Sequence, residues 1–134
     1  NVATVTALTG APVSLDPVKK TDDGGECLFR YANGKMAYRV RIIDVSAAEG
    51  AVSLAPYESQ CASKRTRLNG IGNEAFLCSA KPRLPYAAQV IGRVRNQVFI
   101  IDLPAGSMMG GSAKGSALRD QADAAAEQVA GNLF

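Results

Sequence analysis

The side chains that could do covalent chemistry in this sequence are three cysteines, Cys27, Cys61 and Cys78. The sequence contains no histidine, which excludes Ser-His and Cys-His nucleophile pairs as well as imidazole metal sites. No two cysteines have the C-x-x-C spacing of a zinc knuckle or of a thioredoxin-type redox site. Carboxylates, lysines and a lone thiol are the catalytic groups that remain, and no arrangement of them indicates an active site. We therefore expect a protein that is not an enzyme and that uses no cofactor.

A disulfide between Cys61 and Cys78 is one expectation for the cysteines. The bridge would close a short loop and stabilise the fold by roughly 3 kcal/mol in the chain-entropy model. Cys27 would then be a small buried apolar residue, or it would pair with a cysteine outside this sequence. The sharper alternative is a reactive thiol at Cys27 or Cys61, because Lys64 lies one helical turn from Cys61 and its ammonium could activate that thiol. This alternative would make the protein a thiol-dependent enzyme.

Acidic residues gather at Asp22, Asp23 and Glu26, within the polar, turn-rich stretch 16–26. An EF-hand loop alternates its oxygen ligands over about twelve residues, and this cluster is too compressed for that geometry. We interpret the stretch as a surface loop and expect no metal site.

Basic residues are distributed unevenly along the chain. Between Cys61 and Arg95 there are seven of them against one acid, Glu74, although the net charge of the whole sequence is only +3. If they share a face with the arginines at 39 and 41, that face would attract an anionic membrane surface, glycan or protein; the alternative is an ordinary solvated strand face. The modest net charge and the lack of interleaved aromatic residues argue against nucleic acid. The predicted anionic-partner patch consists of Arg39, Arg41, Lys64, Arg65, Arg67, Arg93 and Arg95.

The segment Pro104 to Gly115 is rich in glycine and carries Met108 and Met109. Its residue order does not match the G-x-x-x-x-G-K-[ST] pattern of a phosphate-binding loop. We interpret it as a flexible connection or a partner-binding loop, in which the methionines supply adaptable apolar contacts. If this loop and the basic face pack on neighbouring copies, the protein would be a structural or assembly subunit that forms homo-oligomers.

Three helices are predicted. A short one covers residues 2–8, where apolar residues recur at helical spacing after the N-cap residue Asn1. A capping box opens a second helix at Ser46, which runs to about Ser63 and which Pro56 should kink or divide. The third covers residues 116–134 and has an apolar stripe. That stripe consists of Leu118, Ala122, Ala125, Val129 and Leu133.

Alternation and turn dipeptides predict the strands. Along residues 36–45, apolar side chains alternate with polar ones, so one face meets the core and the other carries Arg39 and Arg41. The continuous apolar run 98–101 is typical of a central strand that is buried on both faces. The predicted strands are 27–31, 36–45, 74–79, 87–94 and 97–103, with hairpin turns at Asn33-Gly34 and Arg95-Asn96.

These elements predict one α+β domain spanning residues 1–134, a usual length for a single domain. Its largely antiparallel sheet has about five or six strands, and a short N-terminal helix, a middle helix and a C-terminal helix pack on it. The stretch 68–76 joins the two halves. Its Gly70 and Gly72 are expected to supply positive φ or a close backbone approach, and Glu74 is expected to pair with a nearby arginine.

The order of these features resembles a family of small bacterial extracytoplasmic lipoprotein domains with a PsbP-like α+β fold. The matching segments are 8–13, 27–31, the Gly-Ile-Gly-Asn-Glu-Ala-Phe stretch at 70–76, the hairpin at 93–96 and the alanine-rich terminal helix. Family members often have Asp where this sequence has Asn73, so the resemblance does not extend to a paired carboxylate at that turn. It implies an exported domain that is not catalytic.

We therefore expect an exported, non-enzymatic binding or accessory module of the bacterial cell envelope, located in the periplasm, in the envelope or outside the cell. Any signal peptide or lipid anchor would lie upstream of Asn1 and would have been removed. Contact with a membrane would depend on such an anchor, since no apolar run in the sequence approaches the ~20 residues of a membrane span.

Overall fold

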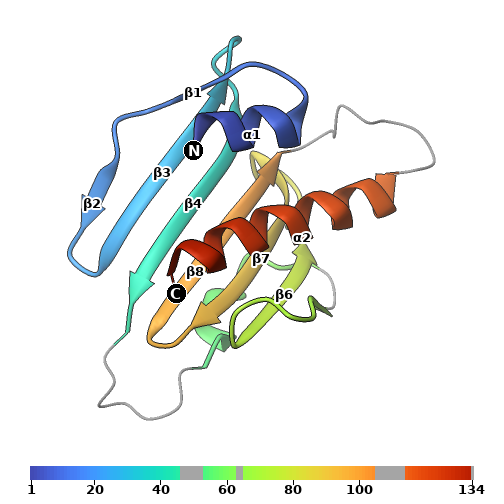
Figure 1. Cartoon of the computed structure of the whole chain (residues 1–134). Coiled ribbons are helices and arrows are strands. Elements are labelled where there is room, and N and C mark those ends of the chain that lie inside the picture. Colours follow the sequence, from blue (N-terminus) through green and yellow to red (C-terminus); the bar gives the residue numbers. More distant parts are fainter. Residues whose placement is uncertain (46–52, 63–64, 105–113, 134) are drawn as a thin grey trace.

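The computed structural model of the protein describes residues 1–45, 53–62, 65–104 and 114–133. It is an α+β fold in which two α-helices lie on one antiparallel sheet of eight strands (Figure 1). The helices are α1 (Val2–Thr9), the 3₁₀ helix η2 (Ala55–Tyr57) and α2 (Lys114–Leu133). The strands are β1 (Val13–Leu15), β2 (Lys19–Thr21), β3 (Gly24–Tyr31), β4 (Met36–Asp44), β5 (Thr66–Arg67), β6 (Glu74–Ser79), β7 (Tyr86–Val94) and β8 (Gln97–Pro104).

The strand order in the sheet is β1-β3-β4-β8-β7-β6-β5, with β2 also paired to β3. Every pairing is antiparallel. Strand β8 lies in the middle, between β4 and β7, and Val98 and Phe99 in it have no exposed surface. The prediction of a central strand buried on both faces is confirmed.

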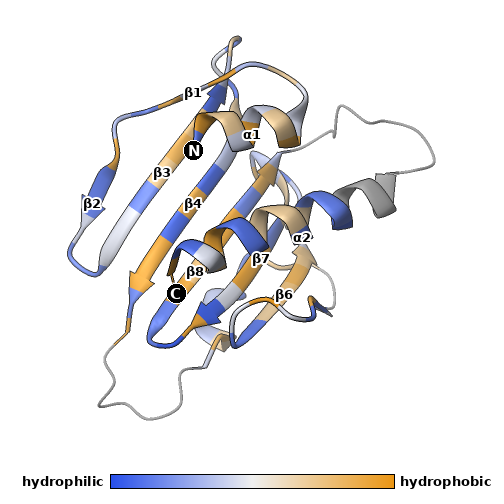
Figure 2. Ribbon diagram, viewed as in Figure 1, coloured by the Kyte–Doolittle hydropathy of each residue, from blue (hydrophilic) through white to orange (hydrophobic). Residues whose placement is uncertain are grey.

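We call the face of the sheet that α1 and α2 cover the front face, and the opposite face the back face (Figure 1). In β4, Tyr38 is buried in the front core, and Val40 and Ile42 pack against that core. The intervening Arg39 and Arg41 point to the back face, as the alternation predicts, and polar and apolar bands follow one another along β4 (Figure 2).

Helix α2 packs on the front face with a stripe of small residues. Its Ala122, Ala126 and Ala130 are at most 3% exposed, so the helix approaches β7 and β8 closely. The predicted stripe is confirmed for Ala122 and Ala125, which are buried, and for its last two members, which pack against the core. The side chain of the first member, Leu118, lies outside the described residues.

The predicted middle helix is wrong across residues 53–62, and its remainder at 46–52 and 63 lies outside the described residues. Only the short η2 is helical there, with Pro56 near its start. The backbone bonds instead to the sheet: the amide of Ala62 donates to Ser79 and that of Lys81 to Gln60. A segment tied to β6 in this way cannot complete the i to i−4 bonds of an α-helix.

A disulfide between Cys61 and Cys78, with Cα atoms 5.6 Å apart, fastens this segment to β6 and confirms the predicted pairing. It holds Leu54 against Ile91, Val98 and Ile100 in a small apolar cluster on the back face. The reactive-thiol alternative is therefore wrong for Cys61, because its sulfur is bonded to another.

The predicted count of five or six strands is too low. Strands β1, β2 and β5 are not among the predicted strands; they have three, three and two residues and lie at the edges of the sheet. The predicted loop at residues 16–26 is wrong in part, because β2 and the beginning of β3 lie within it. Because β2 is exposed throughout, it has no buried face, and its sequence consequently shows no hydrophobic alternation.

The stretch 68–76 turns the chain into β6 through two glycines of positive φ, Gly70 at 74° and Gly72 at 56°. This confirms the predicted backbone conformation. The amide of Asn73 donates to the carbonyl of Arg93, and the Asn73 side chain accepts from the amide of Arg95 at 2.6 Å. Glu74 forms the expected ion pair, with Arg93 at 3.7 Å. The turn is thereby fixed to the end of the β7–β8 hairpin.

Gly72→Ala is expected to destabilise the fold by clearly more than Gly70→Ala. Both substitutions introduce a side chain at positive φ, a strain of the order of 1 kcal/mol. Only at Gly72 would the new Cβ also meet the carbonyl oxygen of Arg93, at 2.5 Å; at Gly70 nothing lies within 4 Å. Urea unfolding of the two variants measures the difference, and equal unfolding midpoints would contradict this account of the turn.

Candidate binding surfaces

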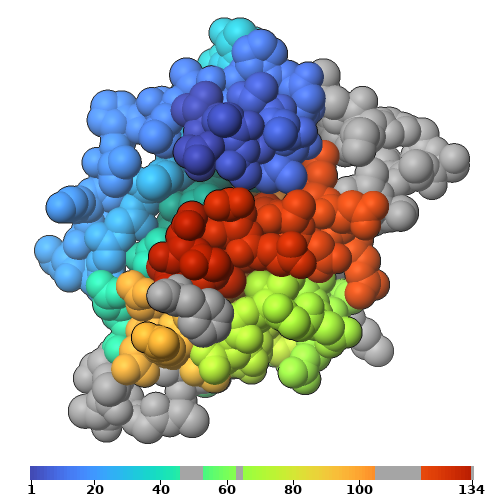
Figure 3. All heavy atoms as spheres, in the orientation of Figure 1, coloured from blue at the N-terminus to red at the C-terminus, as the bar shows by residue number. Residues whose placement is uncertain are grey.

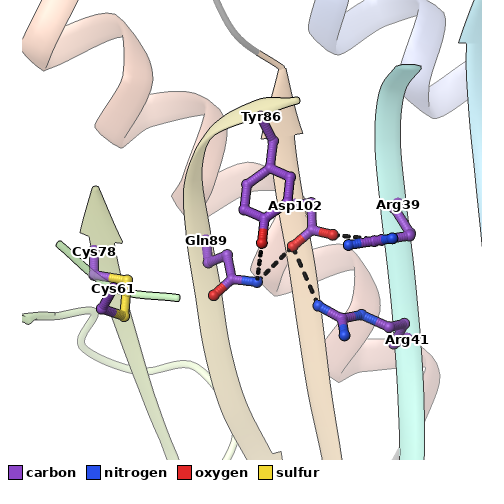
Figure 4. Close-up of polar contacts among 7 residues, drawn as sticks. All are labelled: Arg39, Arg41, Cys61, Cys78, Tyr86, Gln89 and Asp102. Carbon is purple, nitrogen blue, oxygen red and sulfur yellow. Dashed lines mark hydrogen bonds and ion pairs between the residues drawn. A yellow bond between two sulfur atoms is a disulfide. The ribbon is translucent and has the colours of Figure 1, made fainter. Parts of the chain in front are cut away.

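A buried carboxylate lies at the centre of the back face. Asp102 of β8 has no exposed surface. Its Oδ2 accepts from Arg39 Nε at 2.5 Å, and its Oδ1 accepts from Gln89 Nε2 at 2.8 Å and faces Arg41 Nη2 at 3.4 Å (Figure 4). A carboxylate removed from water is tolerated only when it is paired and hydrogen-bonded. These three side chains satisfy that requirement from both neighbouring strands.

The strand register brings this cluster together. Asp102 is directly opposite Arg39 on β4 and directly opposite Gln89 on β7, and Arg41 is the next residue of β4 on the same face. Residues opposite one another on adjacent strands point to the same side of a sheet. The pairing of three central strands therefore positions every member of the cluster.

Tyr86 completes the cluster at the start of β7. Its hydroxyl accepts from Gln89 Nε2 at 3.3 Å, and the guanidinium of Arg39 lies 5.7 Å from its ring centroid, within the range of a cation–π contact. Burial and the nearby Asp102 carboxylate both raise the pKa of Tyr86, and the two arginines partly oppose this rise. The phenol consequently stays protonated.

The two arginines retain unused hydrogen-bonding capacity. Their side chains are 28% and 31% exposed. Arg41 Nε is itself buried, and no group in the described part of the chain accepts from it, so the exposed part of Arg41 is the rest of its side chain. Arg39 bonds to the carboxylate through its Nε, and its side chain extends from β4 toward Asp102 beside that of Arg41 (Figure 4). Two cations share the one carboxylate of the cluster, and Glu26 of β3 lies directly opposite Arg41 on the same face.

Among the other members of the predicted basic patch, the register places Arg67 and Arg93 on the back face as well. The row Phe76, Ile91 and Ile100 separates Arg67 from Arg41. Arg65 pairs with Glu58 at 2.6 Å and stacks on Phe76, with its guanidinium 4.7 Å from the ring centroid. Arg93 forms an ion pair with Glu74 and donates a hydrogen bond to the carbonyl of Arg95. Arg67 is exposed on the edge strand β5. Lys64 and the predicted partner loop with Met108 and Met109 lie outside the described residues.

A second feature is a groove on the front face between α1, α2 and strands β3 and β4. Its volume is about 230 Å³, and the space-filling view shows the depression between the two helices (Figure 3). Cys27, Phe29, Val40 and Ile42 form part of its floor, and Ala125 and Val129 line it from α2. No pattern in the sequence predicts this groove.

Gln121 of α2 ties together the elements around the groove. It is 8% exposed; its Nε2 donates to the carbonyl of Leu8 at the end of α1, at 3.2 Å, and its Oε1 accepts from the hydroxyl of Tyr38 at 3.4 Å. Burial raises the pKa of Tyr38, so this hydroxyl keeps the proton it donates. One amide thus links α2 to both α1 and β4.

Two further observations concern the described residues. Histidines are absent from the sequence, and no three Cys, Asp or Glu side chains come together as a metal site in the described ranges. Neither described α-helix has the length and apolar character needed to cross a membrane.

Comparison with known proteins finds no matching family, no matching curated protein and no matching solved structure.

Replacing both cations of the central cluster, in the variant Arg39→Met with Arg41→Met, is expected to lower the free energy of unfolding by about 3–5 kcal/mol, because Asp102 is left buried with no positive charge beside it and only Gln89 as a donor. Asp102→Asn should cost less, since the two arginines are partly exposed and can be hydrated. Arg30→Met is the matched control: its pair with Asp16 is surface-exposed and should be worth at most about 1 kcal/mol. Chemical denaturation measures all three; a loss in the double variant no larger than in the control would contradict the expectation.

Proposed function

We propose that the protein is an exported, non-enzymatic binding or accessory module of the bacterial cell envelope, and that it recognises an anionic partner through Arg39 and Arg41. The observation that carries the proposal is the shared use of one buried carboxylate, Asp102, by two partly exposed guanidinium groups. The resemblance to PsbP-like lipoprotein domains agrees with this class of function.

The disulfide supports the exported location. Cys61 and Cys78 are bonded, and disulfides form and persist mainly in oxidising compartments outside the cytosol. The same bond leaves Cys61 without a free thiol, and Cys61 is the cysteine that has a possible activating lysine, Lys64, nearby in sequence. This supports a binding function over thiol-dependent catalysis.

The geometry of the arginine pair favours carboxylate groups as its ligand. Guanidinium presents parallel N–H donors that match the two oxygens of a carboxylate, and this match gives specificity as well as charge attraction. Asp102 holds Arg39 through Nε and Arg41 through Nη2, so it orients both side chains before a ligand arrives. A preoriented donor loses less conformational freedom on binding.

The experiment titrates the protein with polyglutamate, an acidic polypeptide, by isothermal titration calorimetry at low and moderate salt. We expect binding that weakens as salt rises, and that is at least about fivefold weaker in Arg39→Lys with Arg41→Lys. These substitutions keep both charges, and with them the pairing to Asp102, but remove the guanidinium fork.

The control variant is Lys20→Gln with Lys35→Gln, two exposed cations on other strands and turns. It lowers the net charge by two, so any loss of affinity that depends only on total charge will appear there. Binding that falls in this control as much as it falls in the arginine variant would reject the proposed site. If the native protein did not bind polyglutamate at low salt, the proposal that it recognises an anionic partner would be refuted.

A further inference from the structure

The front-face groove has an apolar floor and a neutral polar rim. Its floor is formed by side chains from β3, β4 and β8, of which Phe29 and Ile101 are at most 5% exposed and Val40 and Ile42 are half-buried. The rim carries Asn1, the N-cap residue of α1, and Thr4 of α1, together with Gln128 and Asn132 of α2. Among the described residues, no Asp, Glu, Lys or Arg side chain lines the groove.

This distribution of groups selects a class of ligand. An apolar chain laid on the floor would remove apolar surface from water at roughly 25 cal/mol per Å². Amide and hydroxyl side chains at the rim can donate to and accept from an uncharged polar group. A charged head group would find no opposite charge among the described side chains that line the groove, and would lose hydration without compensation.

We propose that the groove binds a neutral amphiphile, with its aliphatic chain on the floor between α1 and α2 and its hydrogen-bonding group at the rim. The proposal goes beyond an anion-recognising module, because it concerns the opposite face of the sheet and ligands of the opposite polarity. Its residues are shared with neither Asp102 nor the arginine pair, so the two proposals succeed or fail separately.

Cys27 provides a reporter inside the groove. It lines the floor, is partly exposed, and is the one cysteine left free by the Cys61–Cys78 disulfide. A ligand on the floor must cover its sulfur and slow its alkylation. The reaction of the unreduced protein with iodoacetamide therefore measures occupancy without added labels.

The test measures the alkylation rate of Cys27 at increasing concentrations of octanol, octanoate and butanol. We expect octanol to slow the reaction at least tenfold at saturation. Butanol should need a concentration at least about tenfold higher, because it buries fewer methylene groups. Octanoate, which has the same chain length with a charged head group, should also bind at least about tenfold more weakly than octanol.

Ala125→Leu fills the groove from α2, where Ala125 is 6% exposed, and should abolish protection by octanol. Ala124→Leu makes the same change on the exposed side of α2 and should leave protection intact. If Ala125→Leu does not fold, as judged by circular dichroism, Val129→Phe replaces it, because Val129 lines the groove and is only half-buried.

Several outcomes would overturn the proposal. Octanol that leaves the alkylation rate unchanged, or that protects the filled variant as well as the native protein, would show that the groove does not hold an aliphatic chain. If octanoate protected Cys27 at the same concentrations as octanol, the preference of the groove for a neutral head group would be refuted. Protection that rises with protein concentration in the absence of ligand would assign the groove to a second copy of the chain.

Discussion

The rest of the structure depends on one constraint, the pairing of a carboxylate that has no access to water. Asp102 lies on the central strand of the sheet, and three side chains from the two adjacent strands satisfy it. Losing any of these partners would leave a charge or a donor unpaired in a buried setting, which is far more costly than losing an exposed contact. The cluster therefore makes the register of β4, β8 and β7 specific, because a shift by one residue would turn Asp102 into the front core.

The same constraint divides the two faces of the sheet. With Asp102, Arg39 and Arg41 on the back face, an apolar helix packed over that region would have to bury charges. Both α-helices lie on the front face, and the back face is covered near Leu54 by a short segment that the disulfide retains. The protein thus presents a polar surface with two partly exposed arginines on one side and an apolar groove on the other.

Residues with strong periodicity were predicted well from the sequence, because one buried face imposes a pattern on the chain. The alternation of β4, the burial of 98–101 and the alanine stripe of α2 all follow from this rule. Edge strands such as β2 escaped prediction because no face of them is buried. The prediction of a middle helix is wrong over residues 53–62 because it rests on a local signal, the capping box at Ser46, and gives too little weight to Pro56. Long-range backbone hydrogen bonds and the disulfide determine the conformation of this segment.

The sites depend on residues that are far apart in sequence, and that is why they were harder to predict. The charge of Arg39 and Arg41 makes them candidates from the sequence alone, but the sequence does not identify Asp102 as the partner that they share. A signal was present: Asp102 stands inside a strand predicted to be buried, and a carboxylate in that position must have a partner. Naming that partner requires the strand order, since Arg39 lies 63 residues away. The groove requires the packing of α1 against α2, and Gln121 links these helices through a contact across 113 residues.

The central claim is that the two faces bind different chemistry independently, and nuclear magnetic resonance tests it most directly. One sample would be titrated with polyglutamate and a second with octanol, while the arginine Nε–H signals and the valine methyl signals are followed. The account predicts that polyglutamate shifts the signals of Arg39 and Arg41 and leaves those of Val40 and Val129 in place. Octanol should do the reverse. Ligands that each move both sets of signals, or that move neither, would contradict it.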